Sequence, residues 1–399
     1  MPKILRIINR FNLGGPAYST AYLTKYLSDD FEIRMIGGQK DDFEESSEFI
    51  LTEMGIEYTI LESMRRKISF KYDRAAYKEI KNIIKEFKPD IVHTHAAKAG
   101  AIGRLAAYKM NVPVIVHTFH GHVFHSYFGF LKTKFFIFLE RYLAKKTSQI
   151  ITLSEQQNHE ICGIHKICSK DKTSIVPNGI GLDYFKKDKV AKRKLFRDEW
   201  SIPDNTIAIG IVGRVVPIKN HSFFLKTFKE TKLATNRKIK GVIIGDGDQM
   251  EFAINEAKRL GLSISTKDDL NSNSDLLFTS WIKSIDCANA ALDIMCLTSL
   301  NEGTPVSLVE AQASGLPVIS TNVGGVKDII VNGKSGTLVE PNDLSNFTKN
   351  LIELVENEEL RLNMGKYGEQ FVFKKFHYKT FCSQMENIYY NLLKESNHN

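Results

Sequence analysis

Two glutamates stand eight positions apart around a segment that suits anion binding. Residues 301–311 read NEGTPVSLVEA. Thr304 is a favoured helix N-cap and Pro305 is favoured at the first helical position, so a helix carrying Glu310 is predicted to begin here. The free N–H groups at such a helix start bind anions. Because Glu302 and Glu310 flank this predicted anion site, their carboxylates suit a ligand that also offers hydroxyl groups.

A pair of cations follows another predicted strand. Gly213-Arg214 and Lys219 stand at a strand-to-helix turn, which places two positive charges near a helix start, as suits a diphosphate. Gly245-Asp246-Gly247 is a tight turn expected at the same edge of the sheet. A sugar nucleotide offers a diphosphate to the cations and sugar hydroxyls to the glutamates. The alternatives are a solvated basic loop and carboxylates that only cap a helix or lie on the surface.

Two further segments of the first half follow predicted strands. Gly14-Gly15-Pro16 combines paired glycines, which let a ligand approach the main chain, with a proline that suits a helix start. Phe119-His120-Gly121-His122 places two histidines at a strand end. Histidine at such a place favours a role in binding. A bare turn and structural histidines are the alternatives.

The elements that must position these residues form a repeating pattern. Short β-branched runs alternate with longer helical patterns, such as residues 73–87 ahead of Pro89, which is typical of a parallel sheet. Each half opens with a strand, a glycine turn and a helix, so two Rossmann-like α/β domains facing each other across a cleft are predicted. The predicted strands cover residues 4–8, 33–36, 91–93, 114–118 and 150–153, then 207–212, 241–244, 276–278, 293–297 and 317–320.

The domain boundaries follow from this pattern. Residues 1–180 are predicted to form the N-terminal domain and residues 181–379 the C-terminal domain. The charged region 178–205 has no strand pattern and is interpreted as the linker. The last helix, over about 380–393, could pack on either half, and we expect residues 380–399 to cross back to the N-terminal domain.

The composition is that of a folded globular protein. Of 399 residues, 43% are hydrophobic and 25% are charged, which argues against disorder and suits two or three domains. The net charge of +8 indicates an anionic partner. Five scattered cysteines without a CxxC pattern, in a chain that also lacks HExxH, predict reduced, mostly buried thiols and no metal site. Because no signal-peptide pattern or membrane-spanning run is present, a cytoplasmic location is expected.

Taken in chain order, five motifs resemble those of glycosyltransferase family 4. They are Gly14-Gly15, Thr118-Phe119-His120-Gly121, Gly213-Arg214 with Lys219, Gly245-Asp246-Gly247, and Glu302 with Glu310. The resemblance extends from residue 4 to about residue 393. It implies the GT-B fold and transfer of a sugar from a nucleotide-sugar with retention of configuration, without a metal or other cofactor. The resemblance also implies that the N-terminal domain is the acceptor-binding domain and the C-terminal domain the nucleotide-sugar-binding domain. Segments 93–100 and 120–124 resemble members that assemble bacterial surface polysaccharides.

The resemblance also implies a role for each matching residue. Arg214 and Lys219 match the pair that neutralises the donor diphosphate, and Glu310 matches the carboxylate on the ribose. Glu302 and His120 match the residues at the reacting sugar, so both are candidate catalytic residues. The other diphosphate contacts are assigned to Gly14, Gly15, Thr304, Pro305, Val306 and Ser307, and the base contacts to Ser280, Trp281 and Ile282. Ser280 stands where the family usually has glycine, which bears on the geometry of the base site.

The expected substrates are a nucleotide-sugar, with a UDP-sugar preferred, and a glycan or polyprenyl-linked acceptor. Residues 127–138 interleave aromatics with lysines, and Arg141, Lys145 and Lys146 follow. Such a segment suits an anionic membrane surface, where a lipid-linked acceptor would lie. A core helix with a basic solvent face is the alternative.

Other functions are disfavoured by particular features. Cations are interspersed with acids and no nucleic-acid module is recognisable, which argues against a nucleic-acid partner. Neither half carries GxGxxG, which argues against a nicotinamide-dependent oxidoreductase. A sugar-nucleotide epimerase with the same two-domain fold is the alternative function.

Overall fold

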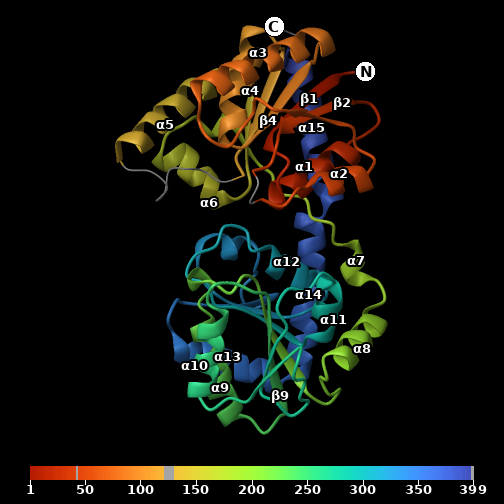
Figure 1. The fold of residues 1–399 in the computed structure, drawn as a ribbon, viewed down its shortest axis with the longest axis vertical. Helices are drawn as coiled ribbons and strands as arrows, with labels where there is room; N and C mark the ends of the chain where they lie inside the picture. The colour runs from red at the N-terminus through yellow and green to blue at the C-terminus, as the bar shows by residue number, and fades with distance from the viewer. Residues whose placement is uncertain (42–43, 121–129, 397–399) are drawn as a thin grey trace. The chain divides into compact units, whose positions relative to one another are not determined.

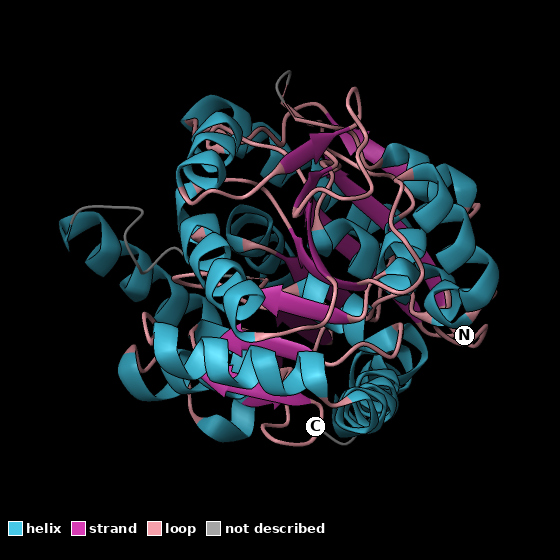
Figure 2. Ribbon diagram, turned by 90° about the horizontal axis from the view of Figure 1, so that it is seen from below, coloured by secondary structure: helices cyan, strands magenta, loops and turns pink. Residues whose placement is uncertain are grey.

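The computed structural model describes all residues except 42–43, 121–129 and 397–399. The chain divides into two compact units, one formed by Met1–Ile180 with Phe376–Asn399 and the other by Gly181–Lys375. Each unit contains one seven-stranded sheet (Figure 1), and helices flank the strands (Figure 2). Every ladder within the two sheets is parallel. The prediction of two Rossmann-like α/β domains is confirmed.

The sheet of the N-terminal unit has the order β3-β2-β1-β4-β5-β6-β7. The direction of winding reverses between β1 and β4, and open α/β sheets bind ligands at the carboxyl end of such a switch point. The strands are β1 (Lys3–Arg10), β2 (Glu32–Gly38), β3 (Tyr58–Leu61), β4 (Ile91–His95), β5 (Val114–Thr118), β6 (Gln149–Thr152) and β7 (Thr173–Ile175).

The last helix, α15 (Tyr378–Ser396), packs on this first sheet. Its Phe381 and Met385 share a buried cluster with Ile4 and Val116 of the central strands. Helix α3 begins a turn earlier than predicted, because the Asp73 carboxylate accepts a hydrogen bond from the main-chain N–H of Ser69 and so satisfies a free donor at the helix start. The other helices of the unit, with α3, are α1 (Gly15–Lys25), α2 (Glu48–Glu53), α3 (Phe70–Phe87), α4 (Ala97–Lys109), α5 (Phe130–Ala144) and α6 (Glu155–Asn158).

The sheet of the C-terminal unit has the order β10-β11-β9-β8-β12-β13-β14, with its switch point between β8 and β12. The strands are β8 (Ile207–Val212), β9 (Ile239–Ile244), β10 (Ile264–Thr266), β11 (Leu276–Phe278), β12 (Ile294–Leu297), β13 (Val318–Thr321) and β14 (Gly336–Val339). The helices are α7 (Asp183–Lys186), α8 (Lys189–Glu199), α9 (His221–Ala234), α10 (Met250–Arg259), α11 (Ile285–Ala291), α12 (Val306–Ala313), α13 (Leu344–Glu356) and α14 (Glu358–Phe376), the last of which runs into the first unit.

All ten predicted strands are present, and the four that the sequence did not predict are β3, β7, β10 and β14. These are the outermost strands of the two sheets. Each is only three or four residues long and is partly exposed. An edge strand has one neighbour and less burial, so it lacks the continuous apolar run that marks a central parallel strand.

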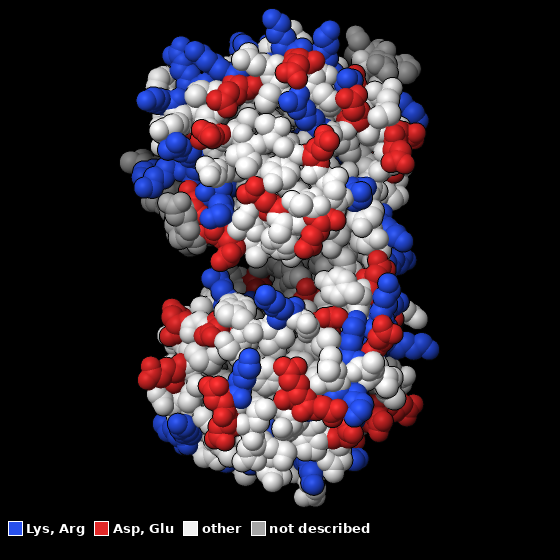
Figure 3. All heavy atoms as spheres, turned by 45° about the vertical axis from the view of Figure 1, so that its right-hand side comes forward, with Lys and Arg blue, Asp and Glu red and all other residues white. Residues whose placement is uncertain are grey.

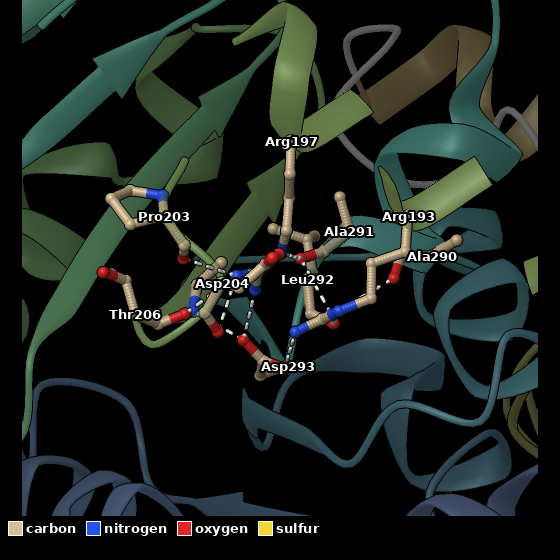
Figure 4. A network of polar contacts seen from close by, with 10 residues as sticks. Arg193, Arg197, Pro203, Asp204, Thr206, Ala290, Ala291, Leu292 and Asp293 are labelled. Carbon is tan, nitrogen blue, oxygen red and sulfur yellow. Dashed lines mark hydrogen bonds and ion pairs between the residues drawn. The ribbon is translucent and has the colours of Figure 1, made fainter. Parts of the chain in front are cut away.

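The interpretation of residues 178–205 as a linker is wrong for its larger part. Helix α8 lies in this region and docks on the C-terminal unit through two arginines (Figure 4). Arg197 is 1% exposed and donates to Asp293 Oδ2 at 2.8 Å, while Arg193 donates to Asp293 Oδ1 at 2.9 Å. The main-chain N–H of Ala208 donates to the same carboxylate at 2.7 Å. The charges that suggested a solvated linker therefore fix α8 to the start of β8 and β12.

We expect Asp293→Asn to lower the free energy of unfolding by about 3 kcal/mol, because removing one partner of a buried ion pair leaves the other charge uncompensated. Asp198→Asn is the matched control, since Asp198 pairs with Lys194 on the surface, where loss of a pair costs less than about 1 kcal/mol. Denaturant unfolding compares the two variants. Equal midpoints would contradict the structural role of Asp293.

All five cysteines are free, but only Cys296 and Cys382 are buried. The expectation of mostly buried thiols is wrong for Cys162, Cys168 and Cys287, which are partly exposed because they lie in or beside short surface helices. Within the described parts of the chain, no helix combines the length and apolar character needed to cross a membrane. The same residues contain no group of three or more histidine, cysteine or carboxylate side chains that could hold a metal ion.

Candidate active site

The switch point of the C-terminal unit brings the loop after β8 against the loop after β12. The main-chain N–H of Leu300 donates to the carbonyl of Ile218 at 2.8 Å. The hydroxyl of Thr298 donates to the carbonyls of Lys219 and Asn220 at 3.1 and 3.0 Å. Two of the motifs found in the sequence are therefore held together at one sheet edge by the main chain.

Lys219 and Glu302 form an ion pair at the centre of this edge. Nζ of Lys219 lies 2.5 Å from Oε1 of Glu302, and the two side chains are 20% and 12% exposed. The hydroxyl of Ser299 donates to the same carboxylate oxygen at 2.6 Å. Charge-assisted hydrogen bonds of this length fix both side chains, so the ammonium and the carboxylate stand at defined positions beside each other.

Arg214 is the second predicted cation of the edge, and its side chain is exposed. No partner for its guanidinium is present among the residues that the structure describes. Gly213, the residue before it, has φ of +153°, and Gly245 after β9 has φ of +136°. A Cβ on Gly245 would lie 2.0 Å from the carbonyl oxygen of Gly213, so the two turns touch through their main chains and glycine is required there.

Helix α12 begins one residue later than predicted. Pro305, not Thr304, precedes its first residue, and no side chain caps it. The N-cap assignment of Thr304 is therefore wrong, because the chain is still extended at Pro305, with φ of −70° and ψ of 98°. The main-chain N–H groups of Val306 and Ser307 donate to no described group. An uncapped helix start with free donors suits an anion.

The loop before α12 contacts a second pair of adjacent glycines, Gly324 and Gly325. The main-chain N–H of Gly325 donates to the carbonyl of Glu302 at 3.1 Å. Gly324 has φ of +51°, and a Cβ there would lie 1.9 Å from the same carbonyl oxygen. Sequence reasoning did not single out this pair, although paired glycines a few residues after a strand are the signal that marked Gly14 and Gly15, and Gly324 follows β13 by three positions. A bulkier side chain would displace the main chain that carries Glu302.

Glu310 lies on the second turn of α12 and is partly buried. No described residue pairs with its carboxylate. Burial without a compensating partner raises the pKa of Glu310 to about 7. The side chain is thus poised between its neutral and charged forms and lacks the donors that a carboxylate ordinarily has, which suits a ligand with hydroxyl groups.

The predicted base site follows β11. Ser280 has φ of +59°, the left-handed conformation that glycine adopts without strain and that the family's usual residue at this place would favour. Its hydroxyl donates to Asp246 at 2.5 Å, and its carbonyl accepts from the N–H of Gly245 at 3.0 Å. Trp281 is 64% exposed and Ile282 is partly exposed. An exposed indole is a surface on which a base can stack.

The switch point of the N-terminal unit carries the other predicted residues. Gly14 precedes α1 and Gly15 begins it, and no side chain caps the helix. A Cβ on Gly15 would meet no atom within 4 Å, so this turn is open to a ligand. His120 directly follows Phe119 at the end of β5. Gly121 and His122, which belong to the same motif, lie outside the described residues.

His120 is accompanied by a histidine that sequence reasoning did not assign to the site. Nδ1 of His95, the last residue of β4, lies 3.0 Å from Nε2 of His120. Burial lowers the pKa of His120 to about 4 and holds the pKa of His95 well below its usual range, so both rings are neutral at pH 7. The alternation of His93 and His95 was the available signal, since residues two apart share a face of a strand.

Acidic and basic side chains are interspersed over the face drawn in Figure 3. On this face the described cations do not form the continuous basic stripe that is typical of nucleic-acid-binding surfaces.

Comparison with known proteins agrees with this geometry. Residues 13–184 match the family described as Glycosyltransferase Family 4, and residues 192–371 match Glycosyl transferases group 1. The UDP-Gal:alpha-D-GlcNAc-diphosphoundecaprenol alpha-1,3-galactosyltransferase of Escherichia coli is 30% identical over 331 residues, 82% of each chain. The capsular polysaccharide biosynthesis glycosyltransferase CapM of Staphylococcus aureus is 27% identical over 341 residues, covering 82% of this chain and 85% of CapM.

Solved structures share the fold over nearly the whole chain. Anabaena Alr3699/HepE in complex with UDP has a TM-score of 0.79 at 16% identity and covers 98% of this chain and 100% of its own. A glycosyltransferase from Rickettsia africae has a TM-score of 0.80 at 20% identity, with coverage of 98% and 99%. At these identities the likeness concerns the fold alone.

Proposed function

This chain belongs to glycosyltransferase family 4, and on that premise we propose that it transfers a hexose or N-acetylhexosamine from a UDP-sugar to a lipid-linked or glycan acceptor. The observation that carries the proposal is the pairing of Lys219 with Glu302 at the switch point of the C-terminal unit. This pair places a lysine ammonium, which suits a diphosphate, next to a carboxylate, which suits sugar hydroxyls. The epimerase alternative is not favoured, because the matching families and the similar proteins are glycosyltransferases.

The donor diphosphate is assigned to the cations and the helix start. Arg214 has no competing partner among the described residues, Lys219 is held in place, and the N–H groups of Val306 and Ser307, which donate to no described group, complete the set. Together these groups supply the charge stabilisation that a leaving diphosphate needs, so the proposal includes no metal cofactor. The carboxylate of Glu310 accepts hydrogen bonds from the ribose, and Trp281 offers its ring to the base.

The acceptor is assigned from the most informative relative. The name of the Escherichia coli galactosyltransferase specifies UDP-Gal as donor and a diphosphoundecaprenol-linked GlcNAc as acceptor. That protein and this chain match over 82% of each. We therefore propose a lipid-diphosphate-linked sugar as the acceptor class, in the assembly of a bacterial surface glycan.

The mechanism proposed is front-face displacement with retention. The bond from the anomeric carbon to the leaving phosphate oxygen breaks as the acceptor hydroxyl oxygen bonds to the same face of that carbon. The leaving phosphate takes the hydroxyl proton. We assign the stabilisation of the positive charge that develops on the ring to the carboxylate of Glu302. The family resemblance assigns a contact with the transferred sugar to the neutral His120. A covalent intermediate on Glu302 is the competing route.

Incubation with single donors tests the proposed function. The protein is supplied with UDP-galactose, UDP-glucose, UDP-N-acetylglucosamine or GDP-mannose, with and without a synthetic lipid-diphosphate-linked GlcNAc. We expect release of UDP from one UDP-sugar, mainly when acceptor is present, together with a lipid product one sugar longer. Conversion of the donor to another sugar without acceptor would instead establish an epimerase.

We expect the affinity for UDP-glucose to rise about tenfold between pH 6 and pH 8, because Glu310 must lose its proton to accept the ribose hydroxyls and its pKa is about 7. Below that pH the carboxyl is protonated, so binding has to expel a proton. A UDP-sugar does not itself titrate in this range. Calorimetric titrations measure the profile, and Glu310→Gln should flatten it. A wild-type affinity that is constant over the range would rule out Glu310 as the ribose ligand.

Peripheral binding to an anionic membrane is proposed for the N-terminal unit. Within α5, Phe136 and Ile137 pack against the buried cluster under the helix, whereas Phe135 and Phe138 are 61% and 70% exposed. The core-helix alternative therefore accounts for only part of α5. Lysines flank these exposed rings at positions 132, 134, 145 and 146, as suits an anionic interface. Residues 127–129 of the predicted segment lie outside the described residues.

We expect the protein to sediment with vesicles that contain anionic phospholipid at low salt and to remain in the supernatant at high salt, because screening weakens the lysine contribution. Replacing Phe135 and Phe138 with serine removes the apolar contribution and should weaken sedimentation at low salt. The absence of sedimentation of the wild-type protein at low salt would end this part of the proposal.

A further inference from the structure

Three histidine rings are stacked at the carboxyl end of β4 and β5 in the N-terminal unit. The ring centroids of His93 and His95 are 4.1 Å apart, and those of His95 and His120 are 5.2 Å apart. His95 is 3% exposed, and its Nδ1 faces Nε2 of His120 at 3.0 Å. Since both rings are neutral, one of these nitrogens carries the proton and the other accepts it.

The inner end of the stack is anchored on both sides. Nδ1 of His93 lies 2.6 Å from the hydroxyl of Tyr389 on α15, and Nε2 lies 2.7 Å from the hydroxyl of Thr118. Arg6 can only donate, and its contact of 3.5 Å to the Tyr389 oxygen leaves the tyrosine proton for Nδ1 of His93. The His93 ring is therefore fixed, and the His95 ring packs against a rigid surface.

Two ring nitrogens of the stack have no partner among the described residues. They are Nε2 of His95 and Nδ1 of His120, and both are buried. Nε2 of His120 is engaged by His95, so whether Nδ1 of His120 carries a proton depends on whether His95 donates to Nε2 or accepts from it. A ring whose second nitrogen is held presents the first nitrogen in one orientation.

We propose that His95 is a positioning residue: it sets the ring orientation of His120 so that Nδ1 of His120 meets the donor sugar. The inference rests on the proposed function, which places His120 at the reacting sugar. His95 itself contacts neither donor nor acceptor. Its contribution is to turnover and not to the binding of the nucleotide.

Replacing His95 by Asn and, in a second variant, by Gln distinguishes a positioning role from a packing role. The amide of Asn reaches the place of Nδ1, whereas that of Gln reaches the place of Nε2. We expect His95→Asn to keep turnover within a few fold and His95→Gln and His95→Ala to lower kcat on the order of 100-fold, the usual effect of a misplaced reacting group. UDP affinity should stay at the wild-type value in all three variants.

The matched control is His117→Asn. His117 is also buried on β5, but its Nδ1 lies 2.9 Å from the hydroxyl of Thr94, away from the stack. It should keep wild-type turnover. Thermal midpoints are recorded for each variant, so that loss of folding is separated from loss of turnover. Turnover is measured as UDP release from UDP-galactose in the presence of lipid-diphosphate-linked GlcNAc.

A double variant completes the test. If His95 acts only through His120, then His95→Ala with His120→Ala turns over as slowly as His120→Ala alone. Equal losses in the Asn and Gln variants, or losses that multiply in the double variant, would overturn the positioning role while leaving His120 at the sugar. Normal turnover in His120→Ala would overturn both the assignment of His120 and the role of His95. Absence of UDP release from the wild-type protein with every donor and acceptor would count against the proposed function itself.

Discussion

Replacing Lys219 with alanine is expected to lower sugar transfer on the order of 100- to 1000-fold, because it removes a preorganised cation from the leaving diphosphate. The change also leaves the Glu302 carboxylate beside that diphosphate with Ser299 as its remaining partner. The negative charges of Glu302 and the diphosphate repel each other, so we expect weaker UDP binding as well as slower turnover. Steady-state kinetics with a saturating acceptor measure both effects.

The matched control for this variant is Lys226→Ala. Lys226 is an exposed lysine on α9, seven positions after Lys219 in the sequence, and its loss should leave transfer unchanged. The thermal midpoint of Lys226→Ala should match the wild-type value, whereas that of Lys219→Ala should be lower because Glu302 loses its ion-pair partner. A cooperative unfolding transition in Lys219→Ala shows that this variant is still folded. Near-normal turnover in Lys219→Ala would remove the diphosphate assignment.

Glu302→Gln is expected to lower kcat about 100-fold while UDP affinity stays the same or improves. The amide keeps the size of the side chain and still accepts from Ser299, but it no longer stabilises positive charge on the sugar ring. Removing a negative charge near the diphosphate also favours the nucleotide. Kinetics give kcat, and calorimetric titration with UDP gives the affinity. Glu251→Gln, on the exposed face of α10, is the matched control for Glu302→Gln and should behave as wild type.

Glu302 also decides between the two routes to retention, which are front-face displacement and a covalent intermediate. Mass spectrometry of the protein mixed with donor searches for a sugar bound to Glu302. A glycosylated Glu302 that turns over on adding acceptor would contradict front-face displacement and establish a covalent intermediate.

Much of the fold follows from the sequence, because the central strands of a parallel sheet are buried on both faces and carry continuous apolar runs. The outer strands β3 and β14 lack such runs because they are short and partly exposed, so the sequence did not predict them. Helix α8 was not predicted for another reason. Its arginines look like solvated charges until Asp293, about a hundred positions later, is placed beside them.

The residues of the donor site could be predicted from the sequence more completely than the geometry of that site. Residue types and spacing pointed to Arg214, Lys219 and Glu302 as one group, and the structure brings Lys219 and Glu302 into contact. The start of α12 and the conformation of Ser280 could not be read from residue types, since both depend on main-chain angles set by neighbouring turns. Pairings across the sheet, such as His95 with His120, need the strand order.

The most direct test of the central claim, that the switch point of the C-terminal unit binds the donor diphosphate, is a calorimetric titration of UDP into the wild-type protein and into Arg214→Ala. We predict saturable binding at one site per chain, weakened about 10- to 100-fold in the variant, because charge-assisted hydrogen bonds to the phosphates are lost. Arg65→Ala, in an exposed loop of the N-terminal unit, should bind as the wild type does. No saturable binding to the wild-type protein, or equal affinities for it and for Arg214→Ala, would contradict the account.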